Sequence, residues 1–583
     1  MKKIIWPLLL LAVCAPVLLV GNAQAGAKLW EKKLSGKILW KQFHSAGVVL
    51  AVTDSELLYG LDPRTGNELY KIEDLAKNIT APDDPPGSPF VLEGTPYILI
   101  VTKAGMIKPE ILKLVNAADG KVVWEGGTTI PAAQLDLIME GKKFKETPEF
   151  RGAAMIQPIF DPAHDQVIVT YRLPVLWAGK AGYSKVARRG TAIAGYDVKT
   201  GKINFAYFPG EDIDNSTVCD FPPVVSGDTG VIDWFGMHSF SVVDGKPLGS
   251  VKFARALKAG MLSRYRYLKT SAGPVIDGDD VYIVVKEHIE AYDLKTGQKK
   301  WASADLDSAI PEFQASGDKL VAKIGGVFCT WAAKPECREF FPYGLAVLDK
   351  GTGKVLAKSG EVDKKNGKAM TSSLVIDNNI AYHGVSNGAR AFDLSTLTYK
   401  WMTSIGKTAD GDEAKLVQVA DGKVVLLNTQ ATAAFNAADG KLLWSKVVPT
   451  VTMDLAMRMA QSFASVAAFA SGVEAGKQGG VINQNQTISR WESTDAGFAN
   501  MMKQVSLADA KGRYNYSMTG KSKNAVIAGV NTKTGELDRG AQVEGRVPDY
   551  MVDPVTGILV NVSKSDPKWI MGFDMNAPLP DIN

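Results

Sequence analysis

Cysteine and histidine are scarce in this sequence, and their scarcity limits the chemistry that it can support. Among 583 residues there are four Cys and five His. No Cys-Cys, Cys-x-x-Cys or Cys-x-x-Cys-His segment occurs, which argues against a paired-cysteine redox centre and a covalently attached haem. The histidines have neither His-x-x-x-His nor His-Glu-x-x-His spacing, so they do not form a sequence-recognisable zinc site. We interpret each of them as a strand or loop residue: His44, His164, His238, His288 and His383.

A strong net charge is also absent. Lys and Arg total 66 against 62 Asp and Glu, which gives a formal charge of +4. So small a charge on so long a chain does not indicate a nucleic-acid partner. Neither a Gly-x-Ser-x-Gly nucleophile elbow nor a Gly-x-x-x-x-Gly-Lys phosphate loop is present.

Long apolar runs are missing except at the N-terminus. Two lysines precede the apolar run Ile4–Val20, and an Ala-x-Ala site ends at Ala25. We therefore interpret residues 1–25 as a cleaved signal peptide, although the run could also act as an uncleaved anchor. Cys14 follows Val13, where a lipoprotein signal requires a smaller residue. The sequence thus predicts a periplasmic or secreted protein that is not a lipoprotein.

Three cysteines remain after the signal peptide. Cys329 and Cys337 flank a short segment, which predicts a disulfide-closed loop in an oxidising compartment. Cys219 has no evident partner.

One phrase recurs along the rest of the chain: an apolar strand ending in Asp or Asn, a tight turn ending in Gly, and a strand with an aromatic residue. Two weaker copies are Phe392–Asp393, where Leu397 replaces the glycine, and Val243–Asp244–Gly245. A further copy is Val530–Asn531 with Thr534–Gly535. The first and last turn residues of the six clearest copies are Asp62 and Gly66, Asn116 and Gly120, Asp197 and Gly201, Asp293 and Gly297, Asp349 and Gly353, and Asn436 and Gly440.

Each copy predicts a β-hairpin. The Asp or Asn side chain can accept hydrogen bonds from amides two or three residues on, and Gly supplies the left-handed conformation that ends the turn. Another strand pair precedes most copies, so one unit has about four strands. The aromatic residue after the turn would lie on the outer strand and pack between neighbouring units.

Residues 291–301, Ala-Tyr-Asp-Leu-Lys-Thr-Gly-Gln-Lys-Lys-Trp, closely resemble the PQQ-like (pyrroloquinoline-quinone-type) β-propeller repeat. The resemblance runs through almost the whole chain and implies an all-β propeller over residues 26–583, with four antiparallel strands in each blade. It implies eight blades, while the hairpins allow seven to ten. Leu29–Lys33 looks like the outer half of a blade whose inner half is Trp569–Asp574, so the two ends could close the ring.

Three segments depart from the repeat. Trp177–Arg189 and Lys252–Lys269 are basic, and are either solvated insertions or surfaces for an acidic or phosphate-bearing partner. Residues 452–510 show apolar spacing typical of a helical hairpin. It could bind a partner or a membrane surface, or pack on itself and the ring. The candidate partner surface on it consists of Met453, Met459, Phe463, Phe498 and Met501.

Two functions remain open. The repeat family includes an outer-membrane assembly scaffold, which implies a non-catalytic binding protein whose partner is another envelope protein and which needs no cofactor. It also includes quinoprotein dehydrogenases, which would bind PQQ beside a calcium ion and oxidise an alcohol or sugar. The adjacent cysteine pair of those enzymes is missing here, and Asp277–Asp280 reads as a hairpin turn, because its glycine comes too early for a calcium loop. The sequence therefore favours the scaffold.

Overall fold

The computed structural model describes most of the chain between residues 28 and 579. The described residues are 28–44, 46–75, 89–92, 95–102, 111–126, 149–151, 155–171, 175–178, 185–189, 192–209, 222–233, 236–252, 272–329, 337–360, 372–385, 387–406, 414–428, 431–447, 514–519, 524–545, 548–553 and 556–579. The predicted signal peptide, Cys219, most of the basic segment 252–269 and the predicted helical hairpin 452–510 lie outside these residues.

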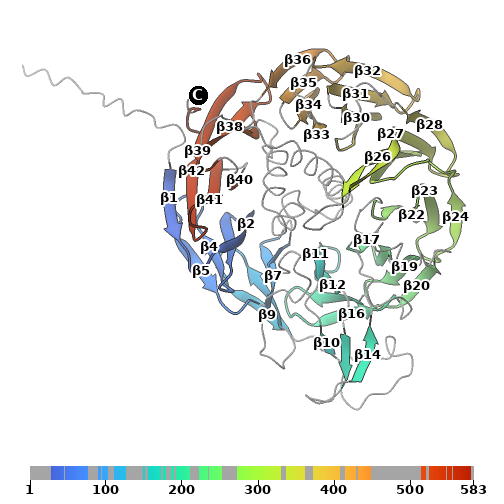
Figure 1. Cartoon of the computed structure of the whole chain (residues 1–583). Coiled ribbons are helices and arrows are strands. Elements are labelled where there is room, and N and C mark those ends of the chain that lie inside the picture. Colours follow the sequence, from blue (N-terminus) through green and yellow to red (C-terminus); the bar gives the residue numbers. More distant parts are fainter. Residues whose placement is uncertain are drawn as a thin grey trace, which may run out of the picture.

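Every regular element in the described ranges is a β-strand, and the sheets form a closed ring (Figure 1). Ten antiparallel sheets make up the ring, and we number them as blades from the one that follows β1. Blade 1 is β2 (Ile38–His44), β3 (Val48–Thr53), β4 (Leu58–Leu61) and β5 (Glu68–Ile72); blade 2 is β6 (Phe90–Val91), β7 (Tyr97–Thr102), β8 (Ile111–Asn116) and β9 (Val122–Gly126); blade 3 is β11 (Met155–Asp161), β12 (Gln166–Tyr171), β15 (Ala192–Asp197) and β16 (Ile203–Tyr207); blade 4 is β17 (Val224–Ser226), β18 (Thr229–Asp233), β19 (Gly236–Ser241) and β20 (Pro247–Lys252); blade 5 is β21 (Val275–Asp277), β22 (Asp280–Val285), β23 (His288–Asp293) and β24 (Lys299–Ala302).

The second half of the chain continues in the same order. Blade 6 is β25 (Glu312–Ser316), β26 (Lys319–Cys329), β27 (Cys337–Asp349) and β28 (Val355–Gly360); blade 7 is β29 (Val375–Asp377), β30 (Ile380–Val385), β31 (Gly388–Asp393) and β32 (Thr398–Ser404); blade 8 is β33 (Ala414–Ala420), β34 (Lys423–Asn428), β35 (Ala431–Asn436) and β36 (Leu442–Val447); blade 9 is β37 (Tyr514–Thr519), β38 (Ala525–Asn531) and β39 (Leu537–Val543); blade 10 is β40 (Asp549–Asp553), β41 (Ile558–Val562), β42 (Trp569–Asp574) and β1. A separate sheet, β10 (Glu149–Arg151), β13 (Val175–Ala178) and β14 (Lys185–Arg189), lies beyond the rim in Figure 1. In the described part of the chain no helix is long and apolar enough to cross a membrane.

The all-β propeller predicted from the sequence is confirmed, but the expected eight blades are too few, and ten is the upper limit of the predicted range. The difference arises because the two weak copies of the hairpin each form a full blade. In blade 7, Leu397 adopts the positive φ of 58° that glycine supplies elsewhere. In blade 4 the turn starts at Ser241, whose Oγ accepts hydrogen bonds from the amides of Val243 and Asp244.

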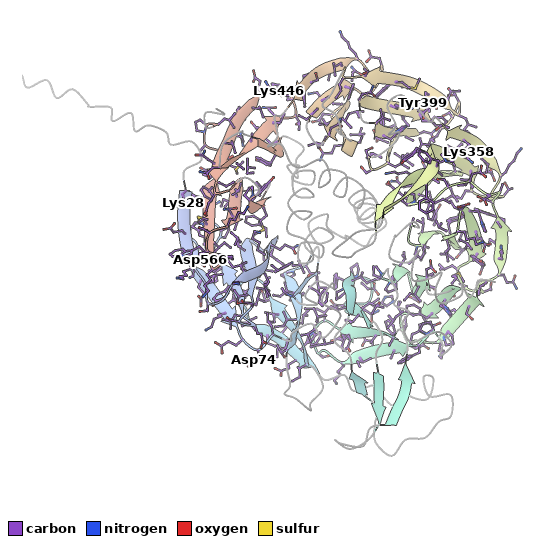
Figure 2. The ribbon with its side chains drawn as sticks, in the orientation of Figure 1. Lys28, Asp74, Lys358, Tyr399, Lys446 and Asp566 are labelled. Atoms are coloured by element: carbon purple, nitrogen blue, oxygen red, sulfur yellow. The ribbon has the colours of Figure 1, made fainter. Side chains whose placement is uncertain are left out.

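The ring closes through its two ends. β1 (Lys28–Lys33) pairs antiparallel with β42, and the register places Glu31 opposite Met571 and Lys33 opposite Trp569. The N-terminal strand thus becomes the outer strand of a blade whose other three strands come from the C-terminal end (Figure 1). Figure 2 shows Lys28 and Asp566 on this shared blade, although more than 500 positions separate them in the sequence. Closure in this way joins the two ends of the chain through the backbone hydrogen bonds of one sheet.

Most neighbouring blades are joined by an aromatic residue of the fourth strand. Trp30 of blade 10 packs on the turn of blade 1, and its Nε1 donates a hydrogen bond to the Pro63 carbonyl at 2.8 Å. The same bond recurs from Trp301 to Lys350, from Trp401 to Ala437 and from Trp444 to Thr532, and Tyr70 Oη donates to Ala117. The acceptor always follows the Asp or Asn that starts the turn. The predicted position of the aromatic residues between blades is therefore observed.

Besides the joint between blades 9 and 10, where β39 carries no aromatic residue, three joints lack this arrangement. Between blades 3 and 4, Phe205 contacts Phe240 at 5.8 Å between ring centroids. Between blades 4 and 5 the backbones of Gly249 and Gly297 meet directly, and β20 carries no aromatic residue. Between blades 6 and 7, β28 also has none, and Leu397 packs among the apolar residues there. Ionisable side chains gather at these three joints.

Truncating one docking tryptophan should destabilise the ring. We expect Trp401→Ala to lower the free energy of unfolding by about 3–5 kcal/mol, because it removes a buried indole and leaves a cavity. Met402→Ala is the matched control, since this neighbour on the same strand is 56% exposed and should change stability by less than about 0.5 kcal/mol. Urea unfolding followed by fluorescence compares the two variants. Equal losses would show that docking does not hold the blades together.

Candidate functional site

The two faces of the ring are built from different connections. Within each blade the strands are antiparallel, so the turn between strands 1 and 2 and the turn between strands 3 and 4 lie on the same face, which we call the turn face. The connections between strands 2 and 3, and those that lead from one blade to the next, lie on the opposite face, which we call the loop face. β1 starts and β42 ends at the turn face.

On the turn face the polar groups are largely used by the turns themselves. Asp197 accepts hydrogen bonds through Oδ1 from the amides of Lys199 and Thr200, and Gly201 N donates to the Asp197 carbonyl at 2.9 Å. The Thr200 hydroxyl and these amides hold the pKa of Asp197 below its usual value, although burial acts in the opposite direction. The first and last turn residues named from the sequence form the same backbone bond in their own copies: Gly66 to Asp62, Gly120 to Asn116, Gly201 to Asp197, Gly297 to Asp293, Gly353 to Asp349 and Gly440 to Asn436.

Charged groups on the turn face also pair with one another. Lys199 lies 2.9 Å from Asp165 within blade 3. Lys350 of blade 6 lies 2.6 Å from Asp277 of blade 5, in the segment that we interpreted as a hairpin turn. Asp277 and Asp280 are indeed the register partners that close this turn. Much of the turn face is therefore occupied by its own interactions.

The loop face carries the described additions to the repeat. β26 and β27 have 11 and 13 residues and extend past the other strands of their blade. In Figure 1, β26 reaches toward the middle of the ring. The extra sheet combines β10, from the connection between blades 2 and 3, with β13 and β14, from the connection between the second and third strands of blade 3. Both additions therefore start from one face.

The two cysteines of the predicted disulfide lie in the β26–β27 extension. The register pairs Cys329 directly with Cys337 across the two strands. The basic segment 177–189 contributes Trp177 and Ala178 to β13 and Lys185–Arg189 to β14. The residues of the predicted partner surface, Met453, Met459, Phe463, Phe498 and Met501, lie outside the described residues.

Sequence reasoning did not identify the ionisable clusters at the joints between blades 3 and 4, 4 and 5, and 6 and 7. At the joint between blades 4 and 5, Glu290 accepts hydrogen bonds from His288 Nε2 at 3.0 Å, from the Tyr292 hydroxyl and from Lys299. Burial acts to raise the pKa of Glu290, but these hydrogen bonds outweigh it and lower the pKa to about 2. Burial and the neighbouring Glu290 carboxylate raise the pKa of Tyr292.

At the joint between blades 6 and 7 the buried groups lie near the loop face. Lys323, 1% exposed, donates to the Ser372 carbonyl at 2.7 Å, and Glu312 accepts from the Leu374 amide at 3.2 Å. Burial lowers the pKa of His383 to about 3, with smaller contributions from Arg390 and Lys323, so its imidazole is neutral at physiological pH. Tyr399 and Lys358, labelled in Figure 2, mark the outer side of this joint on blades 7 and 6.

The only hint of these clusters in the sequence is the missing aromatic residue after the turn, in β20 and β28. Several of their partners could not be paired from the sequence, because they lie far apart in the chain, as Lys323 and Ser372 do. In the described part, no three or more His, Cys, Asp or Glu side chains come together in a way that could hold a metal ion.

The comparisons with known proteins agree with this architecture. Residues 17–143 match a family model, PQQ_2, described as "Outer membrane protein assembly factor BamB". The chain is a PQQ-like β-propeller. The matched residues cover about a fifth of this PQQ-like propeller, and the same blade design continues around the rest of its ring. No curated protein matches its sequence.

Solved structures give only remote likenesses. BamB from Moraxella catarrhalis is 13% identical, with 73% of this chain and 99% of that chain covered and a TM-score of 0.31. Quinohemoprotein alcohol dehydrogenase from Comamonas testosteroni is 14% identical, with 73% and 69% covered and a TM-score of 0.29. A europium-containing methanol dehydrogenase is 14% identical, with 78% of each chain covered and a TM-score of 0.32. Likenesses this remote do not discriminate between functions of the PQQ-like propeller.

The disulfide prediction can be tested directly. Opposite residues of an antiparallel pair have Cα atoms about 4.5–5.5 Å apart, within the span that a disulfide requires. We therefore expect Cys329 and Cys337 to resist alkylation until the exported protein is reduced. Peptide mass spectrometry with sequential alkylation measures this, and Cys329→Ser should make Cys337 reactive without reduction. Free thiols at both positions in the wild-type protein would contradict the prediction.

The pKa of Glu290 predicts a specific dependence of stability on pH. A carboxylate with a lowered pKa in the folded state contributes stability above its ordinary value of 4.5, and loses this contribution as the pH falls toward 2. The difference in unfolding free energy between wild type and Glu290→Gln should thus be constant above about pH 5.5 and shrink below about pH 4.5. Glu68→Gln, at an exposed position, is the control. A difference that does not change with pH would contradict the assignment.

Proposed function

We propose that this PQQ-like propeller is a non-catalytic scaffold of the cell envelope that binds a partner protein through its loop face. The single observation that carries the proposal is the difference between the two faces. On the turn face, Asp, Thr and Lys side chains bond to the turn backbone and to one another. Both described additions to the repeat lie on the loop face. Segments that depart from a rigid repeat usually carry binding in such scaffolds.

Export supports an envelope partner. The N-terminal signal predicted from the sequence would place the ring outside the cytoplasm. The family model that matches residues 17–143 is described as an outer membrane assembly factor, which makes a component of envelope assembly our choice of partner. Both ends of the ring lie on the turn face, so an N-terminal anchor or a C-terminal tag would leave the loop face open.

An exposed aromatic residue, Phe341, offers a contact for a partner on the loop face. Phe341 lies in β27, in the part that extends beyond the rest of the blade, and is 48% exposed. Its ring makes an edge contact with Tyr343 at 5.1 Å between centroids. An aromatic residue held by a neighbouring ring loses little conformational freedom on binding, which suits it to an interface.

Site-specific crosslinking in cells tests which face binds. A photoreactive residue at Phe341 should yield a discrete adduct with an envelope protein after irradiation. The same residue at Lys295, which is 70% exposed on the turn face, should not. Mass spectrometry of the adduct identifies the partner, and Phe341→Ser should reduce its co-purification several-fold without altering the melting temperature. Adducts from Lys295 alone would reverse the assignment of the face.

The dehydrogenase alternative gives a different result in a separate assay. Purified protein is mixed with pyrroloquinoline quinone and calcium, and the melting temperature and dye-linked alcohol or sugar oxidation are measured. The scaffold predicts no turnover and no ligand-dependent shift. A rise in melting temperature together with turnover would overturn the proposal.

A further inference from the structure

Blade 4 is the blade that no tryptophan docks on either side. Its joint with blade 3 depends on Phe205 and Phe240, and Tyr207 stacks on Phe240 at 4.6 Å. Its joint with blade 5 brings Gly249 against Gly297, where a Cβ at Gly297 would come within 3.2 Å of the Gly249 Cα. Neither joint has the tryptophan hydrogen bond that connects several other pairs of blades.

On the turn face, a polar bridge connects blades 3 and 4. His164 Nδ1 lies 2.7 Å from Asp161 Oδ2 in its own turn, and His164 Nε2 lies 3.0 Å from Asp228 Oδ1 in the turn between β17 and β18. Gln166 Nε2 donates to Asp161 Oδ2 and to the Val242 carbonyl of blade 4, both at 3.0 Å. Asp161 is therefore held in place from two sides, and the imidazole spans the joint.

The chemistry of this bridge depends on one proton. A neutral imidazole has one N–H donor and one acceptor nitrogen, whereas an imidazolium has two donors. Each ring nitrogen of His164 faces a carboxylate oxygen, and carboxylates only accept, so both contacts are hydrogen bonds only in the imidazolium form. The other charged group of these turns is Asp165, which pairs at 2.9 Å with Lys199 of the β15–β16 turn, and in the β19–β20 turn of blade 4 Lys246 pairs with Asp244.

We propose that Asp161, His164 and Asp228 form a proton-dependent latch that holds blade 4 to blade 3 while the imidazole is protonated and is released as the pH rises. Burial acts to lower the pKa of His164, but Asp161 and Asp228 outweigh it, and the net effect raises the pKa. For a group with a raised pKa in the folded state, the stabilisation is fully present below the ordinary value of 6.5. It is lost as the pH rises through the folded value.

Release would expose one turn of blade 4 without opening the Trp-docked joints. Deprotonated His164 can donate to only one of the two carboxylates, and the other contact places a lone pair against a negative charge. Since Asp228 is 77% exposed, it can turn toward solvent, while Asp161 is 4% exposed and keeps its bond from Gln166. The contact that breaks is therefore the one between the blades.

Hydrogen exchange of the full-length protein tests the latch. Exchange is followed by mass spectrometry from pH 6 to pH 9, with times scaled to the intrinsic chemical rate. Protection of residues 224–233 should fall with pH, by up to roughly tenfold for each unit by which the pKa of His164 is raised. His164→Gln should remove this dependence, and Asp228→Asn should weaken it.

Asp318→Asn is the matched control, because Asp318 occupies the position of Asp228 in blade 6 and pairs only with Lys319 among the described ion pairs. It should leave the exchange of blade 4 unchanged. NMR titration of the His164 ring gives an independent readout, with an expected pKa above 6.5. Protection that does not vary with pH, a dependence retained in His164→Gln, or a measured pKa at or below 6.5 would each overturn the proposal.

Discussion

The ring depends on one contact, in which the fourth-strand aromatic residue of a blade packs on the turn of the next blade. The contact requires glycine for two reasons: the turn needs a positive φ, and a Cβ at Gly66 would come within 2.5 Å of the Trp30 ring. The indole N–H then bonds to a carbonyl that the turn already holds in place. Each blade thus positions the carbonyl acceptor for the aromatic residue of the preceding blade. Through Trp30 on β1, the shared blade formed by β1 and β42 makes the same contact with blade 1. Because the contact is local to a pair of blades, adding another copy of the phrase adds another blade.

Much of this fold could be predicted from the sequence, because its determinants lie within about ten residues of one another. Asp293, Gly297 and Trp301 define a turn and the docking residue that follows it, and closure could be predicted from the half-blade sequence at each end. The number of blades could not, since Leu397 and Ser241 perform roles that the pattern assigns to Gly and Asp. The polar joints were missed for a different reason. Asp228 lies 64 positions from His164, and nothing in a single sequence indicates that their turns meet.

The candidate site follows from topology more than from any single residue. Antiparallel strands in every blade place the Asp or Asn turns on one face, and the connections between strands 2 and 3 and between blades on the other. An addition to a blade is therefore tolerated on the loop face, where it does not interrupt the docking contacts. The sequence predicted a disulfide-closed loop at Cys329 and Cys337 and identified Trp177–Arg189 as a departure from the repeat, but it could not place these two segments on a common face. That step requires the strand order, which the structure provides.

The distribution of histidine shows how the ring combines two kinds of joint. Tryptophan docks five of the ten joints, through Trp30, Trp124, Trp301, Trp401 and Trp444, and the five histidines lie at other joints. His44 contacts the Tyr97 carbonyl of the next blade, His164 contacts Asp228, and His288 shares its strand face with Tyr292, which packs on blade 4. On β19, His238 lies on the same side as Phe240, which faces blade 3. The positive charge of Lys323 in blade 6 contributes to lowering the pKa of His383. The indole of a tryptophan joint does not titrate, so its hydrogen bond does not depend on pH. A histidine joint responds to its neighbours: carboxylates raise the pKa of His164, and burial beside cations lowers that of His383. The ring therefore combines indole contacts that do not titrate with histidine contacts whose protonation depends on the joint.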